Sequence, residues 1–172
     1  KYWSVDSEQC LLDLGCGEAY YSHALSQHFP AHQWSVLDIA KPGVQMAGKR
    51  KFAKHAVVGS AYDLPFDDHS FDDVLCVFSP FSADELKRVL KPNGRFILVG
   101  PAPAHLNQLA SLIYDQVKPH GGNISETEQL SDFTLVDTQY NICLTGRNHP
   151  NGACIWNKEN FQIILWLIIH LA

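Results

Sequence analysis

A short apolar run that ends in a glycine turn constrains the fold of this chain more than any other feature. Cys10 to Leu14 predicts a buried strand, Gly15-Cys16-Gly17 a tight turn, and Glu18 to Phe29 carries apolar residues at helical spacing. Small residues in such a turn let the backbone pass close to a ligand, while the following helix presents free N–H groups. Strand, turn and helix together predict a nucleotide-type cofactor site in an α/β sheet.

The rest of the chain continues the alternation of strands and helices. We expect further strands over residues 34–39, 55–59, 71–78, 95–99, 133–142 and 161–171, with a helix as the open alternative for the last run. Helices are expected over 42–51, 83–90 and 106–117, and Lys91-Pro92-Asn93-Gly94 predicts a turn. The pattern predicts an α/β fold with a doubly wound, mostly parallel sheet, built as a single domain over residues 1–172.

Charge and composition limit the classes of function. Thirteen Lys and Arg against 18 Asp and Glu give a net charge of -5, which is the wrong sign for holding RNA through phosphate contacts alone. Binding of RNA would then need a local basic patch or a further module. The basic run 48–54 is either such a patch or a solvated helix face. The 5 cysteines form no Cys-x-x-Cys pair, and no apolar run approaches the roughly 20 residues that span a bilayer. We therefore expect a cytoplasmic protein with no membrane segment and no metal site.

Two carboxylates decide which cofactor the turn suits. Asp13 precedes Gly15 by two places, where it would repel a pyrophosphate but suits a ligand that carries a sulfonium and an amine. Asp38 closes the second expected strand, where a carboxylate can accept hydrogen bonds from both ribose hydroxyls. S-adenosyl-L-methionine has these groups. A nicotinamide dehydrogenase is disfavoured by Asp13 and by Ala19, where a third glycine is usual.

The motif order resembles that of class I S-adenosylmethionine-dependent methyltransferases, which have a Rossmann-like seven-stranded sheet. The resemblance rests on residues 12–21, 59–66, 70–72 and 86–95. Residues 16–23, 79–86 and 101–106 resemble, more narrowly, the bacterial 23S ribosomal RNA guanine-N1 methyltransferases. The match covers residues 8–118, whereas 146–172 diverges. Those enzymes carry a zinc module before the first strand, and we expect the chain to lack it and to be incomplete at both ends.

The resemblance implies a set of site residues. Asp13, Gly15, Cys16, Gly17, Tyr20, Tyr21, Asp38, Ile39, Ser60, Ala61, Tyr62 and Phe78 are expected to bind the cofactor. Ser60 stands where the family often has Asp, so Ser60 and the Ala61 backbone are expected to contact the adenine amino group. At least one of the two tyrosines should cover the methionine part, and Cys16 has no partner that would make it a nucleophile.

The substrate side of the site is expected at Ser79, Pro80, Phe81 and His105. The first three could form a platform for a flipped purine, with core packing as the alternative for Phe81. Guanine N1 must lose a proton near the time of attack, and His105 is the candidate catalytic residue, with a bystander surface histidine as the alternative.

Three functions stay open. The first is methylation of guanine N1 in ribosomal RNA, with weak intrinsic RNA affinity. The second is methylation of a small molecule such as a quinone precursor, which the acidic balance favours. The third is a catalytically impaired cofactor-binding fragment. A homodimer is compatible with each of them, because Trp156, Trp166 and the apolar tail could pack on the sheet or on another chain.

Overall fold

The computed structural model describes residues 7–101, 130–144 and 161–171. Seven strands form one sheet: β1 Cys10–Leu14, β2 Gln33–Asp38, β3 Ala53–Val58, β4 Phe71–Val77, β5 Leu90–Pro101, β6 Phe133–Leu144 and β7 Phe161–Leu171. Three helices accompany them: α1 Tyr20–His28, α2 Lys41–Lys49 and α3 Ala83–Val89. The expected helix over 106–117 lies outside the described residues.

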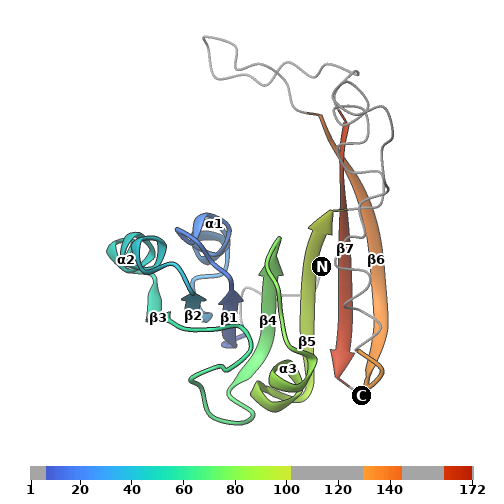
Figure 1. The fold of residues 1–172 in the computed structure, drawn as a ribbon, viewed down its shortest axis with the longest axis horizontal. Helices are drawn as coiled ribbons and strands as arrows, with labels where there is room; N and C mark the ends of the chain where they lie inside the picture. Colours follow the sequence, from blue (N-terminus) through green and yellow to red (C-terminus); the bar gives the residue numbers. More distant parts are fainter. Residues whose placement is uncertain (1–6, 102–129, 145–160, 172) are drawn as a thin grey trace.

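The strand order is β3-β2-β1-β4-β5-β7-β6, and Figure 1 shows it from one edge to the other. Strands β1 to β5 are parallel, whereas β7 is antiparallel to both β5 and β6. The order reverses beside β1, so the carboxyl ends of β1 and β4 flank a crevice of the kind in which open α/β sheets bind ligands. The expected doubly wound, mostly parallel sheet is confirmed, and the run 161–171 is a strand rather than a helix.

Both faces of the sheet are covered because side chains alternate along each strand. On one face, Trp34 packs with Leu25 of α1, and Val36 packs with Ala47 of α2. On the other face, Leu12, Leu14 and Leu37 join Leu86 and Val89 of α3 in the largest buried cluster. The sheet is therefore the middle layer, with α1 and α2 on one face and α3 on the other.

The expected turn over 91–94 is part of β5 instead. Phe71 of β4 is paired with Leu90, and Asp73, two residues later, is already paired with Arg95. The extra residues of β5 bulge out of the ladder, with Asn93 in the left-handed region at φ 62°. A Cβ on Gly94 would lie 2.7 Å from the Lys91 carbonyl oxygen, so this bulge requires a glycine.

An ion pair joins the two strands just past the bulge. Arg95 donates from Nε and one terminal nitrogen to the two oxygens of Asp73, at 2.7 and 2.6 Å. Asp73 is buried, and a two-point contact of this kind fixes the side chains in one orientation. No helix among the described residues has the length and apolar character needed to cross a bilayer.

Candidate functional site

The glycine turn is tied to the end of β2 by main-chain hydrogen bonds. The N–H groups of Gly15 and Cys16 both donate to the Leu37 carbonyl oxygen, at 2.8 and 2.9 Å. Gly15 and Gly17 have φ of 74° and 52°, in the region that glycine tolerates. The turn therefore stands at the carboxyl edge of the sheet with its path set by β2.

Two close approaches leave no room for a side chain at Gly15, in the turn, or at Gly43, beside it. A Cβ on Gly15 would lie 1.9 Å from Oγ of Ser79, at the end of β4. A Cβ on Gly43, in the first turn of α2, would lie 2.8 Å from the Gly17 carbonyl oxygen. The turn is thus held between the end of β4 and the start of α2.

Asp38 links the turn to α2 through its carboxylate. Oδ2 accepts from the Gly17 N–H at 2.7 Å, and Oδ1 accepts from the Ala40 N–H at 2.8 Å. Asp38 is half-buried, and each carboxylate oxygen can accept a second hydrogen bond. The side chain is therefore oriented by the protein and still able to accept hydroxyl groups.

Asp13 lies beneath the turn and is 3% exposed. Its carboxylate accepts a hydrogen bond from the Ser22 hydroxyl of α1 at 2.5 Å. Burial raises the pKa of Asp13 from 3.8 to about 6; the Ser22 hydrogen bond opposes this, and the nearby Asp38 charge adds to it. The Asp13 carboxylate therefore presents no exposed oxygen, and only its electric field reaches across the turn.

Exposed aromatic and aliphatic side chains gather around this turn. Nine large hydrophobic side chains are exposed among the described residues, and five of them belong to the expected cofactor set: Tyr20 at 70%, Tyr21 at 54%, Ile39 at 77%, Tyr62 at 62% and Phe78 at 46%. We call these five the apolar rim. They follow β1, β2, β3 and β4 at the same edge of the sheet, and exposed apolar groups concentrated in one place mark a binding surface.

Phe78 carries backbone strain within this rim. It has φ 53°, which is rare for a bulky residue, and its N–H donates to the Val99 carbonyl oxygen at 2.8 Å. Strained residues of this kind gather at ligand-binding sites, because the surrounding structure holds them there.

The loop after β3 supplies Ser60 and Ala61. Ser60 pairs with Asp63 in an isolated bridge, and its Oγ accepts from the Tyr62 N–H at 3.1 Å. Both Ser60 and Ala61 are partly exposed, so their main chain is accessible from the same edge. The loop is held by its own hydrogen bonds.

The expected substrate residues do not all share one environment. Ser79 is partly buried against Gly15, and Pro80 is exposed. Phe81 is 2% exposed and packs its ring on Phe96 at a centroid distance of 5.0 Å. The platform expectation is wrong for Phe81, because its ring fills the core below α3. His105 lies outside the described residues.

Cys16 is poorly suited to act as a nucleophile. Burial raises the pKa of its thiol to about 12, and the charges of Asp13 and Asp38 act in the same direction. It therefore stays protonated, as expected for a small residue within the turn.

Sequence reasoning missed Ser22 and Gly43. Ser22 orients Asp13 from the first turn of α1, and Gly43 admits the Gly17 carbonyl group. Ser22 stands at helical spacing from Leu25 and Phe29, and this spacing was a signal in the sequence that Ser22 faces the sheet. A glycine directly after Pro42 in a helix start was such a signal for Gly43.

These features fit S-adenosylmethionine. Gly17 has open space where a Cβ would stand, which permits close main-chain approach, and Asp38 retains acceptor capacity for ribose. The buried Asp13 carboxylate would add negative charge near a cationic ligand. The apolar rim can cover the adenine and the methionine carbon chain.

Comparisons with known proteins agree with this chemistry. The family profile described as methyltransferase domain matches residues 12–98. The 23S rRNA (guanine(748)-N(1))-methyltransferase of Streptomyces fradiae is 29% identical over 105 residues, which covers 60% of this chain and 38% of that protein. The demethylmenaquinone methyltransferase of Thermotoga maritima is 31% identical over 111 residues, covering 60% of this chain and 48% of that protein. The chain thus spans less than half the length of these relatives.

A solved structure shares the fold. The S-adenosylmethionine-dependent methyltransferase from Aquifex aeolicus superimposes with a TM-score of 0.63 at 15% identity, over 95% of this chain and 82% of that one. The resemblance seen in the motifs is confirmed, and so is S-adenosyl-L-methionine as the cofactor of this class. The chain belongs to the methyltransferase domain family and has the Rossmann-like fold of S-adenosylmethionine-dependent methyltransferases.

Proposed function

We propose that this chain is the catalytic core of an enzyme that methylates N1 of a guanine in ribosomal RNA. The observation that carries the methyltransferase part is the apolar rim around the Asp38–Gly17 hydrogen bond at the carboxyl edge of the sheet. The RNA part is supported by the similarity to the Streptomyces fradiae enzyme and by the motifs over residues 79–86.

Each part of the site has a distinct role in this proposal. When bound, S-adenosylmethionine supplies an electrophilic methyl group on a sulfonium. Asp38 accepts the ribose hydroxyls while the turn keeps it oriented, and Ser60 with the Ala61 main chain contacts the adenine amino group. Tyr20 or Tyr21 covers the methionine part. Asp13 favours a ligand with positive charge, since an ionised carboxylate under the turn attracts a sulfonium and an amine.

Methyl transfer needs alignment and exclusion of water more than covalent help from the protein. Ser79 lies against Gly15 of the turn and is followed by the exposed Pro80, and in this proposal the base enters beside these two residues. His105 remains the candidate for receiving the N1 proton.

The first experiment is calorimetric titration with S-adenosylmethionine, on wild type and on Asp38→Ala. Loss of Asp38 removes the ribose acceptor and frees the turn, so affinity should fall at least about tenfold, since hydrogen bonds to a charged group contribute about 1.5–3 kcal/mol each. Asp84→Ala is the matched control, because it removes an exposed carboxylate of the same type from α3. Equal affinity of wild type and Asp38→Ala would contradict the cofactor site.

The second experiment offers the same samples unmodified ribosomal RNA and, separately, a demethylated quinone, with a labelled methyl donor. Label in RNA at guanine N1 supports the proposal. Label in the quinone would favour the small-molecule alternative, for which the Thermotoga maritima relative is the specific observation. Cofactor binding with transfer to neither would favour the impaired fragment.

A further inference from the structure

The cations of the described residues fall into two groups. Those of α3 and β5 are all neutralised: Lys87 pairs with Asp132, Arg88 with Glu85 and Asp68, Lys91 with Asp72, and Arg95 with Asp73. Those at the end of α2 and the start of β3, namely Lys49, Arg50, Lys51 and Lys54, form no ion pair with any residue that the structure describes. We call these four the basic edge. Lys41, at the start of α2, forms no such ion pair either, so the basic edge holds four of the five cations without an ion pair among the described residues.

The basic edge is held in position by neutral contacts. Arg50 donates from Nε to the Glu18 carbonyl oxygen at 2.9 Å, which leaves its charge unneutralised. Lys54 donates to the Gln33 side-chain oxygen at 3.0 Å, and the Gln33 amide in turn donates to Glu8. Since Gln33 is the first residue of β2, Lys54 stands at the amino edge of the sheet. Arg50, by contrast, contacts the residue that directly follows Gly17, so the basic edge extends from the amino edge of the sheet to the glycine turn.

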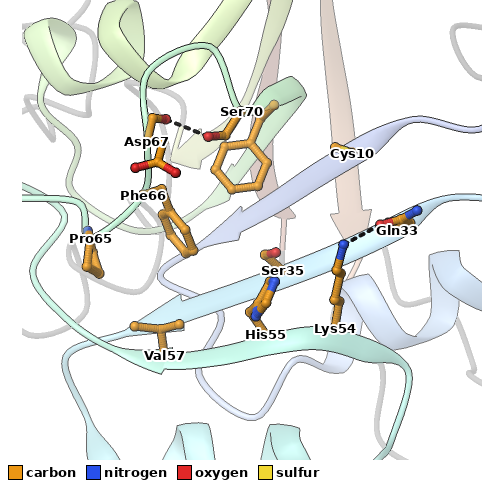
Figure 2. Close-up of a pocket in the computed structure, with 11 residues that line it drawn as sticks. Cys10, Gln33, Ser35, Lys54, His55, Val57, Pro65, Phe66, Asp67 and Ser70 are labelled. Atoms are coloured by element: carbon orange, nitrogen blue, oxygen red, sulfur yellow. Dashed lines mark hydrogen bonds between the residues drawn. The ribbon is translucent and has the colours of Figure 1, made fainter.

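A pocket of about 370 Å³ opens beside Lys54. Figure 2 shows the Phe66 ring, from the loop before β4, on the side of the pocket opposite Ser35 and His55, while the Ser70 hydroxyl donates to the Asp67 carbonyl oxygen. Phe66 is partly exposed and braced by Phe71, whose ring meets it edge to face at 5.0 Å. The pocket therefore combines an aromatic ring, hydroxyl and imidazole groups, and a lysine, in a volume typical of small-ligand sites.

We propose that the basic edge and this pocket form a second RNA contact, in which the lysines bind backbone phosphates and the pocket receives one unpaired nucleotide. Cations beside an aromatic ring are the combination with which proteins hold single-stranded nucleic acid, since phosphates pair with lysine and bases stack on rings. RNA fits better than an acidic peptide because the pocket offers a ring face and polar groups together, at the scale of a nucleobase. Asp67, at the rim, would face exocyclic amino groups and not phosphates.

This inference rests on the proposed RNA substrate and places part of its binding away from the methyl-transfer crevice. The nucleotide in the pocket is not the one that is methylated, because the lining of the pocket includes none of the residues expected to bind the cofactor or the substrate base. The surface would compensate for the unfavourable overall charge and fix the strand that enters the crevice.

The test is RNA binding by fluorescence anisotropy as a function of salt, with single-stranded fragments of ribosomal RNA. Lys51→Gln/Lys54→Gln should weaken binding about tenfold and lower the slope of log affinity against log salt by about 1.4, since each lost phosphate contact contributes about 0.7 for a single strand. Lys87→Gln/Lys91→Gln is the matched control, because it removes the same net charge from ion-paired positions. It should leave affinity and slope unchanged.

A third variant tests the pocket. Phe66→Leu keeps an apolar side chain against the core but removes the ring, so it should weaken binding of single-stranded RNA several-fold and leave binding of a duplex unchanged. Affinity for S-adenosylmethionine, measured on every variant, reports whether the fold is kept.

The outcomes separate the two proposals. If wild type binds and methylates RNA but the two double variants behave alike, the second contact is wrong and the proposed function stands. If wild type neither binds nor methylates RNA, both fail. If Lys51→Gln/Lys54→Gln weakens binding while Phe66→Leu does not, the basic edge attracts anions without a nucleotide pocket, and the pocket part is overturned.

Discussion

Asp13 shows how a single residue is altered by its surroundings. In the unfolded chain its pKa is near 3.8, whereas burial raises it to about 6 in the folded protein, against the effect of the Ser22 hydrogen bond. Between these two values the folded state binds more protons than the unfolded state. The free energy of unfolding therefore falls as the pH rises through this window, and the loss is complete above about pH 6. The protein keeps an ionised carboxylate under the turn at the expense of stability.

Asp13→Asn should consequently stabilise the protein at neutral pH. Asparagine cannot ionise, and the Ser22 hydroxyl can rotate to accept its amide hydrogen. The gain over wild type should be near zero at about pH 3.5 and approach about 3 kcal/mol at about pH 7, the value that corresponds to a pKa of about 6 against 3.8. Urea denaturation across this range measures it. A gain that does not change with pH would contradict the assignment.

The same substitution should weaken S-adenosylmethionine binding at pH 7, because the field that favours a cationic ligand is lost. Opposite changes in stability and affinity are expected where a buried charge serves function.

At the scale of elements, α2 contacts the site through its first turn. Gly43 lets the helix approach the Gly17 carbonyl group, while Asp38 and Ala40 hold the helix start to the end of β2. The position of α2 and the path of the turn are therefore coupled, and a shift of the helix should move the main chain of the turn.

Two glycines of α2 offer a matched comparison. Gly43→Ala places a Cβ 2.8 Å from the Gly17 carbonyl oxygen, whereas a Cβ on Gly48 meets only the Ala56 Cβ at an ordinary 3.7 Å. Gly48→Ala should therefore raise the free energy of unfolding by up to about 1 kcal/mol. Gly43→Ala should lower it and should weaken S-adenosylmethionine binding at least several-fold, because the turn must shift. Thermal unfolding and calorimetry of the two variants test this, and equal behaviour would show that α2 and the turn are not coupled.

At the scale of the whole molecule, β7 joins the edge strand β6 to the parallel part of the sheet. β7 lies between β5 and β6 and pairs with β5 from Arg95–His170 to Pro101–Ile164. Figure 1 shows these strands as the far half of the sheet from β3. Without β7, β6 loses the strand on which it pairs and β5 becomes an exposed edge.

A chain that ends at residue 160 should therefore aggregate. Its β5 would present unpaired N–H and C=O groups beside buried apolar side chains such as Phe96 and Leu98, and exposed apolar edges pair with other chains. Size-exclusion chromatography with light scattering at several concentrations measures this, and a chain that ends at residue 171 is the control. A well-behaved monomer ending at residue 160 would show that β7 is dispensable.

The sequence by itself determined the elements and much of the candidate site. Cys10 to Phe29 and the strand that ends at Asp38 were readable because a strand, a glycine turn and a helix depend on local backbone preferences and apolar spacing. The residues of the apolar rim were predicted as members of the cofactor set by the resemblance to class I methyltransferases, and the structure places them at one edge because the carboxyl ends of parallel strands meet there.

Only the tertiary structure decided the features that depend on segments far apart in the chain. Phe81 was assigned to the core by its contact with Phe96, and the turn over 91–94 became a bulge through pairing with β4. Three further features also depend on segments far apart in the chain. They are the contact between Gly43 and Gly17, the insertion of β7 beside β5, and the pairing of some cations with carboxylates while others stay unpaired. None is encoded by local spacing, since each depends on which surfaces meet once the layers have packed.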